Sequence, residues 1–322
     1  MLNYENYINA LNSIKVLEED NKNNRLAHTY LLENGDMDLG FCYAKKMTKI
    51  ILNLVGLSPA SFQVDKNVHP DVKIYGDKIK FNSEMASEIV SDVLVMPYEG
   101  ERKVYILLNA DDINEEAQNK LLKTLEEPPA SAYFILVCRS EKTLLQTIIS
   151  RCKKIIIKNP TEEEIAEMLS RVSDDKNKIN TVSVCAAGNA SKALKMLESP
   201  SFIKLYDNVF EMFRTMNSSR DILPFVAKFS TKDFLVQDFL TITESVAMDI
   251  IYLLSKAESL IQNKHKTNEL KIIATMFSIP ALVKILKECF DFRESLYYNV
   301  NTTIGLDEFL LKFVEVKVKC KR

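Results

Sequence analysis

One stretch decides the fold class: Glu115-Glu-Ala-Gln-Asn-Lys-Leu-Leu-Lys-Thr-Leu-Glu-Glu127, then Pro128-Pro129, then Tyr133-Phe-Ile-Leu-Val-Cys138. Its first part repeats apolar residues every four positions, which predicts an amphipathic helix. Asn114 is suited to cap the start of this helix, and the two prolines end it because proline cannot continue a helix. The continuous apolar run that follows predicts a strand covered on both faces, as in a parallel sheet.

The same alternation runs through residues 1–160. Five short apolar runs predict strands at Thr29–Leu32, Val72–Tyr75, Val104–Leu108, Tyr133–Cys138 and Lys154–Ile157. Helical periodicity lies between them and is clearest in Ser83–Val95 and Glu115–Glu127. Strands that alternate with helices predict an α/β domain built on an open parallel sheet.

After Pro160 the pattern becomes helical. Thr161 and Glu164 carry the signature of a capping box, in which each side chain binds the backbone N–H of the other residue. Further helices are predicted at Ala190–Leu197, Asp207–Met216, Asp233–Leu260, Leu270–Cys289 and Leu306–Val316. We therefore predict three parts: an α/β domain over residues 1–160, a small helical domain over 161–200 and a helical domain over 201–322.

Two patterns in the helical part invite an interpretation. Six phenylalanines recur at helical spacings, which favours a core or a subunit contact over base stacking: Phe202, Phe210, Phe213, Phe225, Phe234 and Phe239. Basic residues near the end predict a solvated terminus: Lys312, Lys317, Lys319, Lys321 and Arg322. A weak DNA or membrane patch is the alternative for these basic residues.

The composition excludes several classes of protein. The 322 residues are 47% hydrophobic and 27% charged, and a net charge of −2 gives no general attraction to nucleic acid or membranes. The start of the chain has no signal-peptide pattern, and the longest apolar runs are too short to span a bilayer. Six scattered cysteines without a C-x-x-C pair predict reduced thiols and no metal site. We therefore expect a cytoplasmic protein without membrane or metal binding.

Several motifs carry a resemblance to one family. The segment Asn119-Lys-Leu-Leu-Lys-Thr-Leu-Glu-Glu-Pro-Pro129 resembles the helix and turn of bacterial clamp-loader ATPases of the gamma, tau and delta-prime type. Other matching segments follow in the family's order: Arg25–Leu31, His69–Asp71, Pro97–Gly100, Arg102–Val104, Thr147–Cys152, Asn299–Asn301 and Leu306–Phe313. The resemblance is strong over residues 25–160, weaker over 161–200 and thin beyond.

This resemblance implies an AAA+ domain with a parallel αβα sandwich, a small helical lid, and a helical collar domain that assembles into a pentameric ring. It also implies a component of the DNA polymerase III holoenzyme. The partners would be the gamma/tau ATPase subunits and the delta subunit, and together they would load the sliding clamp onto primed DNA.

The nucleotide-binding loop of the family is degenerate in this chain. An active relative has a P-loop after its first strand, whose backbone N–H groups, lysine and hydroxyl hold the phosphates and Mg²⁺. Here the lysine position is Gly40 and the hydroxyl position is Phe41. Glu33, Asp36 and Asp38 lie in the same segment and would repel a triphosphate.

Two further nucleotide-handling elements are also changed. The acidic pair that would hold Mg²⁺ at the end of the third strand is Leu108 and Asn109. Asp111 and Asp112 follow out of register and are interpreted as solvated turn residues. The lid position that would carry an arginine is Ser191. We therefore predict that this chain has no ATPase activity and binds no cofactor, and that ATP and Mg²⁺ are held by a partner subunit.

Arg151 is the main candidate for function. It lies in Ser150-Arg-Cys152, which matches the Ser-Arg-Cys motif of the family. The resemblance implies an arginine finger, which donates a rigid and permanently charged guanidinium to the phosphate of a neighbouring subunit. The alternative is a structural arginine paired with a local carboxylate. Ser150 and Cys152 are included as neighbours in the motif.

Other chemically suggestive residues receive structural interpretations. Glu126 and Glu127 form a carboxylate pair with no partner for acid–base chemistry, so we expect them to support the turn or a subunit contact. His28 and His69 are expected to be structural histidines. Cys152 lacks a base placed by the sequence, which argues against a nucleophile.

Two other functions stay open at the level of sequence. The first is an active clamp-loader ATPase of the gamma/tau type with a degenerate P-loop, which would bind an ATP analogue tightly in the presence of Mg²⁺. The second is an AAA+ adaptor outside replication, whose pull-down would lack the clamp-loader subunits and the clamp.

Overall fold

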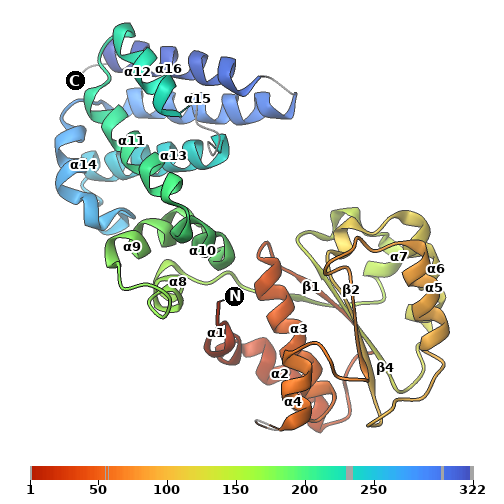
Figure 1. Ribbon diagram of the computed structural model, residues 1–322. Helices are drawn as coiled ribbons and strands as arrows, with labels where there is room; N and C mark the ends of the chain where they lie inside the picture. The colour runs from red at the N-terminus through yellow and green to blue at the C-terminus, as the bar shows by residue number, and fades with distance from the viewer. Residues whose placement is uncertain (1, 55, 57, 230–234, 299–300, 320–322) are drawn as a thin grey trace. The chain divides into compact units, whose positions relative to one another are not determined.

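The predicted alternation of strands and helices is present in the structure, a computed structural model (Figure 1). The structure describes residues 2–54, 56, 58–229, 235–298 and 301–319. It divides into two units, which are treated separately. The first contains the residues up to Glu164 together with Asn189–Ser191, and the second contains Ile165–Gly188 and the residues from Lys192 on.

The first unit is built on a five-stranded sheet in which every pair of neighbouring strands is parallel. The strands are β1 (Thr29–Glu33), β2 (Val72–Tyr75), β3 (Lys103–Leu107), β4 (Ala132–Cys138) and β5 (Lys153–Ile156), in the spatial order β2-β3-β4-β1-β5. All five predicted strands are confirmed, with bounds shifted by at most one residue. Each strand of a parallel sheet ends at the same edge, so this topology gathers the strand ends and the loops after them.

Helices cover both faces of the sheet (Figure 1). One face carries α2 (Asn12–Lys22), α3 (Met37–Ile51) and α4 (Pro59–Asp65), and the short α1 (Glu5–Ala10) precedes them. The other face carries α5 (Ser83–Asp92), α6 (Glu115–Glu126) and α7 (Gln146–Ile149). The strands β3 and β4 are buried over their whole length, as a sheet covered on both faces requires. The parallel αβα sandwich is thereby confirmed.

The helix boundaries follow the capping signals in the sequence. The Oδ1 of Asn114 accepts a hydrogen bond from the backbone N–H of Ala117 at 2.9 Å, so the predicted N-cap of α6 is confirmed. The predicted capping box is also confirmed. The backbone N–H of Thr161 donates to the carboxylate of Glu164 at 2.8 Å, and that of Glu164 donates to the Thr161 hydroxyl at 3.2 Å.

Beyond β5, the regular elements of the described chain are helices joined by turns and short loops. They are α8 (Glu162–Leu169), α9 (Lys176–Cys185), α10 (Ala190–Glu198), α11 (Pro200–Thr215), α12 (Ile222–Phe229), α13 (Val236–Leu254), α14 (Thr267–Ala274), α15 (Ile279–Tyr297) and α16 (Thr302–Lys319). In the second unit, the stripe of α16 that includes Phe309 and Phe313 packs on other buried phenylalanines. Five of the six phenylalanines noted in the sequence are buried, and Phe234 lies outside the described residues.

Two predicted long helices differ from the structure: the first is two separate helices, and the second ends earlier than predicted. Leu270–Cys289 is two helices, because Pro280 lies in the first turn of α15 and has no backbone N–H with which to continue α14. The helix predicted at Asp233–Leu260 ends at Leu254, and Lys256 adopts a left-handed backbone with φ 59° just beyond it. Asp233 itself lies outside the described residues.

The basic end of the chain is not uniformly solvated. Lys317 is 1% exposed, and its Nζ donates to the carbonyl of Phe213 at the end of α11. The expectation of a solvated position is therefore wrong for Lys317. The terminal Lys321 and Arg322, and Asn299 of the matching motif, lie outside the described residues.

The three-part division at residues 160 and 200 stays a prediction. Within the residues that the structure describes, no helix combines the length and the apolar character needed to cross a bilayer.

Candidate functional site

The N-terminus of α3 lies where a P-loop would hold phosphate. Strand β1 ends at Glu33 and α3 begins at Met37, so a short turn of residues 34–36 replaces a glycine-rich loop. A helix N-terminus presents free backbone N–H groups and a partial positive charge, which makes it a natural site for an anion. A side chain of this turn occupies that position.

The carboxylate of Asp36 fills it. Asp36 is the N-cap of α3 and is 1% exposed. Its Oδ1 accepts hydrogen bonds from the backbone N–H groups of Asp38 at 3.1 Å and Leu39 at 3.2 Å. The chain's own carboxylate therefore satisfies the donors that a P-loop would offer to phosphate.

Donors from distant parts of the sequence also bind Asp36. Together, Tyr4, Asp36 and Ser191 form what we call the anion cluster. The Tyr4 hydroxyl donates to Asp36 Oδ2 at 3.0 Å. The backbone N–H of Ser191 binds the same oxygen at 3.0 Å, and the Ser191 hydroxyl lies 2.5 Å from Oδ1. Burial raises the pKa of Tyr4 well above its usual value, so its hydroxyl remains a protonated donor.

The turn before Asp36 is held by its own side chains. Asn34 is 5% exposed, and its Oδ1 accepts a hydrogen bond from the backbone N–H of Asp36 at 2.6 Å. Its Nδ2 donates to the carbonyl of Ile157 at 2.8 Å, just beyond β5. The turn is thus tied to the sheet and holds Asp36 over the helix terminus.

The two degenerate P-loop positions face the interior of the first unit. A Cβ atom at Gly40 would lie 2.7 Å from Val137 Cγ1 on β4. The sheet therefore occupies the space that a side chain at position 40 would need. Phe41 is 6% exposed and belongs to the core. A lysine at position 40 would have to displace Val137, and it would start from the buried face of α3.

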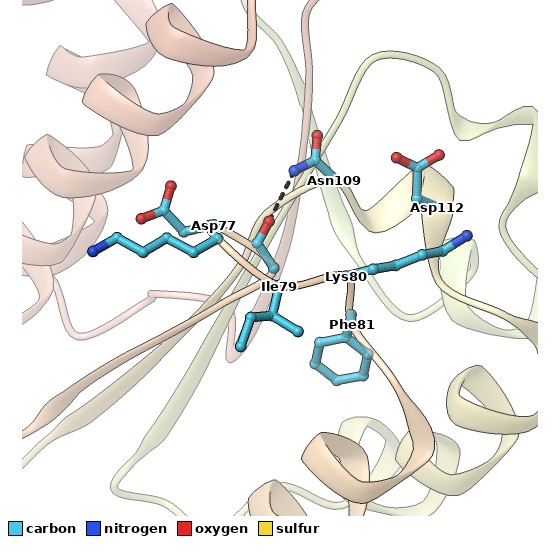
Figure 2. A pocket seen from close by; sticks show the side chains of 8 residues that line it. Asp77, Ile79, Lys80, Phe81, Asn109 and Asp112 are labelled. Carbon is cyan, nitrogen blue, oxygen red and sulfur yellow. Dashed lines mark hydrogen bonds between the residues drawn. The ribbon is translucent and has the colours of Figure 1, made fainter.

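The end of β3 has no acidic pair. Leu108 is 4% exposed and its backbone N–H donates to the carbonyl of Tyr75 on β2. Asn109 adopts a left-handed conformation with φ 51°, and its Nδ2 donates to the carbonyl of Gly76 at 2.9 Å. Figure 2 shows this bond beside a cavity of about 220 Å³ whose lining includes Asn109, Asp112, Lys78 and Lys80.

Arg139, at the end of β4, binds the acidic residues that follow β3. Its backbone N–H donates to Asp111 Oδ1 at 3.3 Å, and its guanidinium lies 3.4 Å from Asp112 and 2.9 Å from Asn109 Oδ1. The side chain of Asp111 is only 12% exposed, so the expectation of a solvated turn residue is wrong for Asp111. The side chain of Asp112 is 50% exposed, as expected. The sequence could have indicated Arg139, since neighbouring parallel strands end at one edge.

Arg151 lies between α7 and β5. Its NH1 group donates to the carbonyl of Thr147 at 2.6 Å, and its NH2 group forms an ion pair with Glu126 at the end of α6. The Arg151 side chain is 33% exposed and that of Glu126 is 42% exposed. The structure therefore brings together the two motifs that the sequence singled out, residues 119–129 and 150–152. This pairing with a local carboxylate is the one that the structural alternative for Arg151 predicted, and the predicted role of Glu126 in the turn or in a subunit contact stays a prediction.

The neighbours of Arg151 in the motif have structural contacts. The Ser150 hydroxyl donates to the carbonyl of Thr147 at 3.1 Å. Cys152 packs against the core under α6, and burial raises the pKa of its thiol to about 12. Because the thiolate is the reactive form, a thiol with this pKa is a poor nucleophile at neutral pH.

The histidines have structural contacts as well. His28 Nδ1 lies 2.8 Å from the carbonyl of Ala132, and its ring stacks on Tyr133. His69 is 6% exposed, and its Nδ1 accepts a hydrogen bond from the backbone N–H of Asp71. Among the residues placed by the structure, no group of three histidine, cysteine or acidic side chains is arranged to hold a metal ion.

Comparison with known proteins gives matches over both parts of the chain. The family described as "DNA polymerase III, delta subunit" matches residues 10–161, and its C-terminal counterpart matches residues 200–315. The chain is similar to a DNA polymerase III subunit delta' of Buchnera aphidicola, with 26% identity over 66% of this chain and 66% of the relative. The delta' subunit of Bacillus subtilis is 23% identical over 64% of this chain and 65% of its own length.

A gamma subunit is similar too. The DNA polymerase III subunit gamma of Buchnera aphidicola subsp. Schizaphis graminum is 26% identical over 73% of this chain and 72% of the relative. The matches to the two delta' relatives span just under two thirds of those proteins. Because the two family models together match most of its length, the chain belongs to the DNA polymerase III subunit family that they describe, and it is similar to delta' subunits.

Proposed function

We propose that this chain is a non-hydrolysing, delta-prime-like subunit of a bacterial clamp loader. It works in the cytoplasm with gamma/tau ATPase subunits and a delta subunit in a pentameric ring, which places the sliding clamp on primed DNA for replication. ATP and Mg²⁺ are held by a neighbouring subunit. Arg151 reaches that neighbour's nucleotide and completes its site.

The observation that carries the proposal is the buried carboxylate of Asp36 at the N-terminus of α3. A phosphate there would have to displace Asp36 or lie beside it. Two unit charges about 4 Å apart repel by about 4 kcal/mol at an effective dielectric constant of about 20. That energy is a factor of about 10³ in affinity, which argues against nucleotide binding at this terminus.

Two further contacts support the same conclusion. Position 40 faces Val137 rather than a ligand, and position 109 is an asparagine bound to the Gly76 carbonyl. A carboxylate for Mg²⁺ is therefore missing from the place where a hydrolysing relative needs one. These observations favour the delta-prime-like function over an active gamma/tau-like ATPase, although a gamma subunit is among the relatives.

The exposure of Arg151 supports its proposed role toward a neighbouring subunit, because one third of its side chain is exposed at the end of a short helix. A guanidinium is planar, permanently charged and able to bind two phosphate oxygens at once. An arginine finger accelerates phosphoryl transfer by about 10³–10⁵.

The proposal is tested by equilibrium binding of a fluorescent ATP analogue to the purified full chain, with an assembled gamma/tau subunit as the positive control. We expect no saturable binding at micromolar analogue with Mg²⁺. Tight, Mg²⁺-dependent binding would support the active ATPase instead. A pull-down from the native host that lacks gamma/tau, delta and the clamp would support an adaptor outside replication.

A further inference from the structure

Three contacts hold the guanidinium of Arg151, and the weakest is that of NH1 with the Ser150 hydroxyl at 3.4 Å. The Thr147 carbonyl binds NH1 at 2.6 Å, and the Glu126 carboxylate binds NH2. The carbonyl belongs to α7 and the carboxylate to the last residue of α6. The guanidinium is therefore fixed by two helices that pack against each other, rather than by its own flexible stem.

This arrangement orients a planar group. A guanidinium carries five N–H donors in one rigid plane. Contacts on both terminal nitrogens define the direction of that plane, and the N–H donors that these contacts leave can serve another acceptor. Preorganised donors of this kind contribute most when charge develops in a transition state, because they need not be reoriented then.

Stability is a poor explanation for the Glu126 contact. Both side chains are partly exposed, at 42% for Glu126 and 33% for Arg151. Exposed ion pairs contribute little to folding, since water screens the charges and two long side chains must be ordered. The contact has a clearer purpose if the orientation of Arg151 matters for function.

We infer that Glu126 is a positioning residue for Arg151: it holds the guanidinium in the orientation that reaches a neighbour's phosphate. This inference rests on the proposed function of Arg151 as a finger in trans. Glu126 itself touches neither nucleotide nor reacting atoms. Glu127, the next residue, is exposed and offers a matched control of the same charge.

The test uses the clamp loader reconstituted with the full chain as wild type, Glu126→Gln, Glu127→Gln, Arg151→Ala and the double variant Glu126→Gln/Arg151→Ala. Size-exclusion chromatography verifies assembly, and kcat and KM for ATP are measured with primed DNA and clamp. A displacement of about 1 Å can cost about 10²-fold in rate. We therefore expect Glu126→Gln to lower kcat by about 10- to 100-fold with KM nearly unchanged, and Glu127→Gln to behave as wild type.

The double variant separates positioning from a general structural effect. If Glu126 acts through Arg151, then Glu126→Gln has no further effect once Arg151 is alanine. Equal rates for Glu126→Gln and Glu127→Gln would overturn the inference, as would a Glu126→Gln loader that is faster than wild type. The inference would also fall if Glu126→Gln lowered kcat as much in the Arg151→Ala background as it does in wild type. If Arg151→Ala alone left kcat unchanged, the proposed function itself would fall, which is a distinguishable result.

Discussion

The hydroxyl of Ser191 lies 2.5 Å from the carboxylate of Asp36, at the N-terminus of α3. In the sequence these residues are two separate departures, one in the P-loop and one at the lid position. In the structure they belong to one hydrogen-bonded cluster with Tyr4. The N-terminus of α3 is therefore occupied by a carboxylate of the chain itself, which is held by donors from three parts of the sequence.

Replacing Asp36 by alanine tests this cluster. The change leaves buried N–H and hydroxyl donors without an acceptor, which costs about 1–3 kcal/mol of unfolding free energy. We expect a clear fall in the midpoint of urea unfolding, followed by circular dichroism. Asp38→Ala also removes a carboxylate that contacts the Ser191 hydroxyl, at 2.9 Å, but it keeps the Asp36 cap, so its effect should be smaller. Equal effects of the two variants would show that Asp36 has no special role.

Restoring a lysine at position 40 should not restore nucleotide binding. Any side chain there meets Val137 on β4, and overpacking of a core costs about 1–3 kcal/mol. We expect Gly40→Lys to melt at a lower temperature and to bind no more ATP analogue than wild type. A gain of Mg²⁺-dependent binding in this variant would mean that the N-terminus of α3 is open to phosphate after all.

Much of the first unit follows from local patterns. The strands are nearly continuous apolar runs, and N-caps such as Asn114 and Thr161 are satisfied by residues three positions away, so a short window of sequence contains the whole signal. The same is true of the loss of the P-loop lysine. Residues 275–278 show the limit, because the apolar period continues across them although α14 ends before them and α15 begins after them.

The parts that escape prediction depend on residues distant in sequence. Tyr4 reaches Asp36 across 32 positions, Ser191 reaches Asp36 across 155, and no local pattern links these residues. The pairing of Glu126 with Arg151 needs α6 and α7 side by side. Arg139 meets Asp111 only because β3 and β4 end at one edge.

Cys152 should resist alkylation in the native chain. Burial raises the pKa of its thiol to about 12, so the group stays protonated until the pH approaches that value. At pH 8 the thiolate fraction is then on the order of 10⁻⁴, against roughly a quarter for a free cysteine with a pKa of about 8.5. Iodoacetamide labelling at pH 8, read by peptide mass spectrometry, should spare Cys152 until urea is added. Rapid labelling without urea would contradict the unreactive state expected of this half-buried thiol.

Gly305 allows the close packing of α16 on α15. A Cβ atom at this position would lie 2.3 Å from the Phe292 ring. We expect Gly305→Ala to reduce stability by about 1–3 kcal/mol, measured by thermal unfolding. Gly35→Ala is the control, because a Cβ at Gly35 meets no atom within 4 Å. If both variants melted alike, the contact between these helices would be looser than the structure indicates.

The central claim is that Arg151 serves a nucleotide held by a neighbour. The most direct measurement is DNA-stimulated ATP hydrolysis by a reconstituted loader that carries Arg151→Ala, with Arg171→Ala as the control. Arg171 is also a partly exposed arginine in a salt bridge, but it lies outside the motif. We predict that Arg151→Ala leaves assembly intact and lowers hydrolysis at the neighbouring site by about 10³–10⁵, while Arg171→Ala behaves as wild type. An assembled Arg151→Ala loader with unchanged hydrolysis would contradict the account.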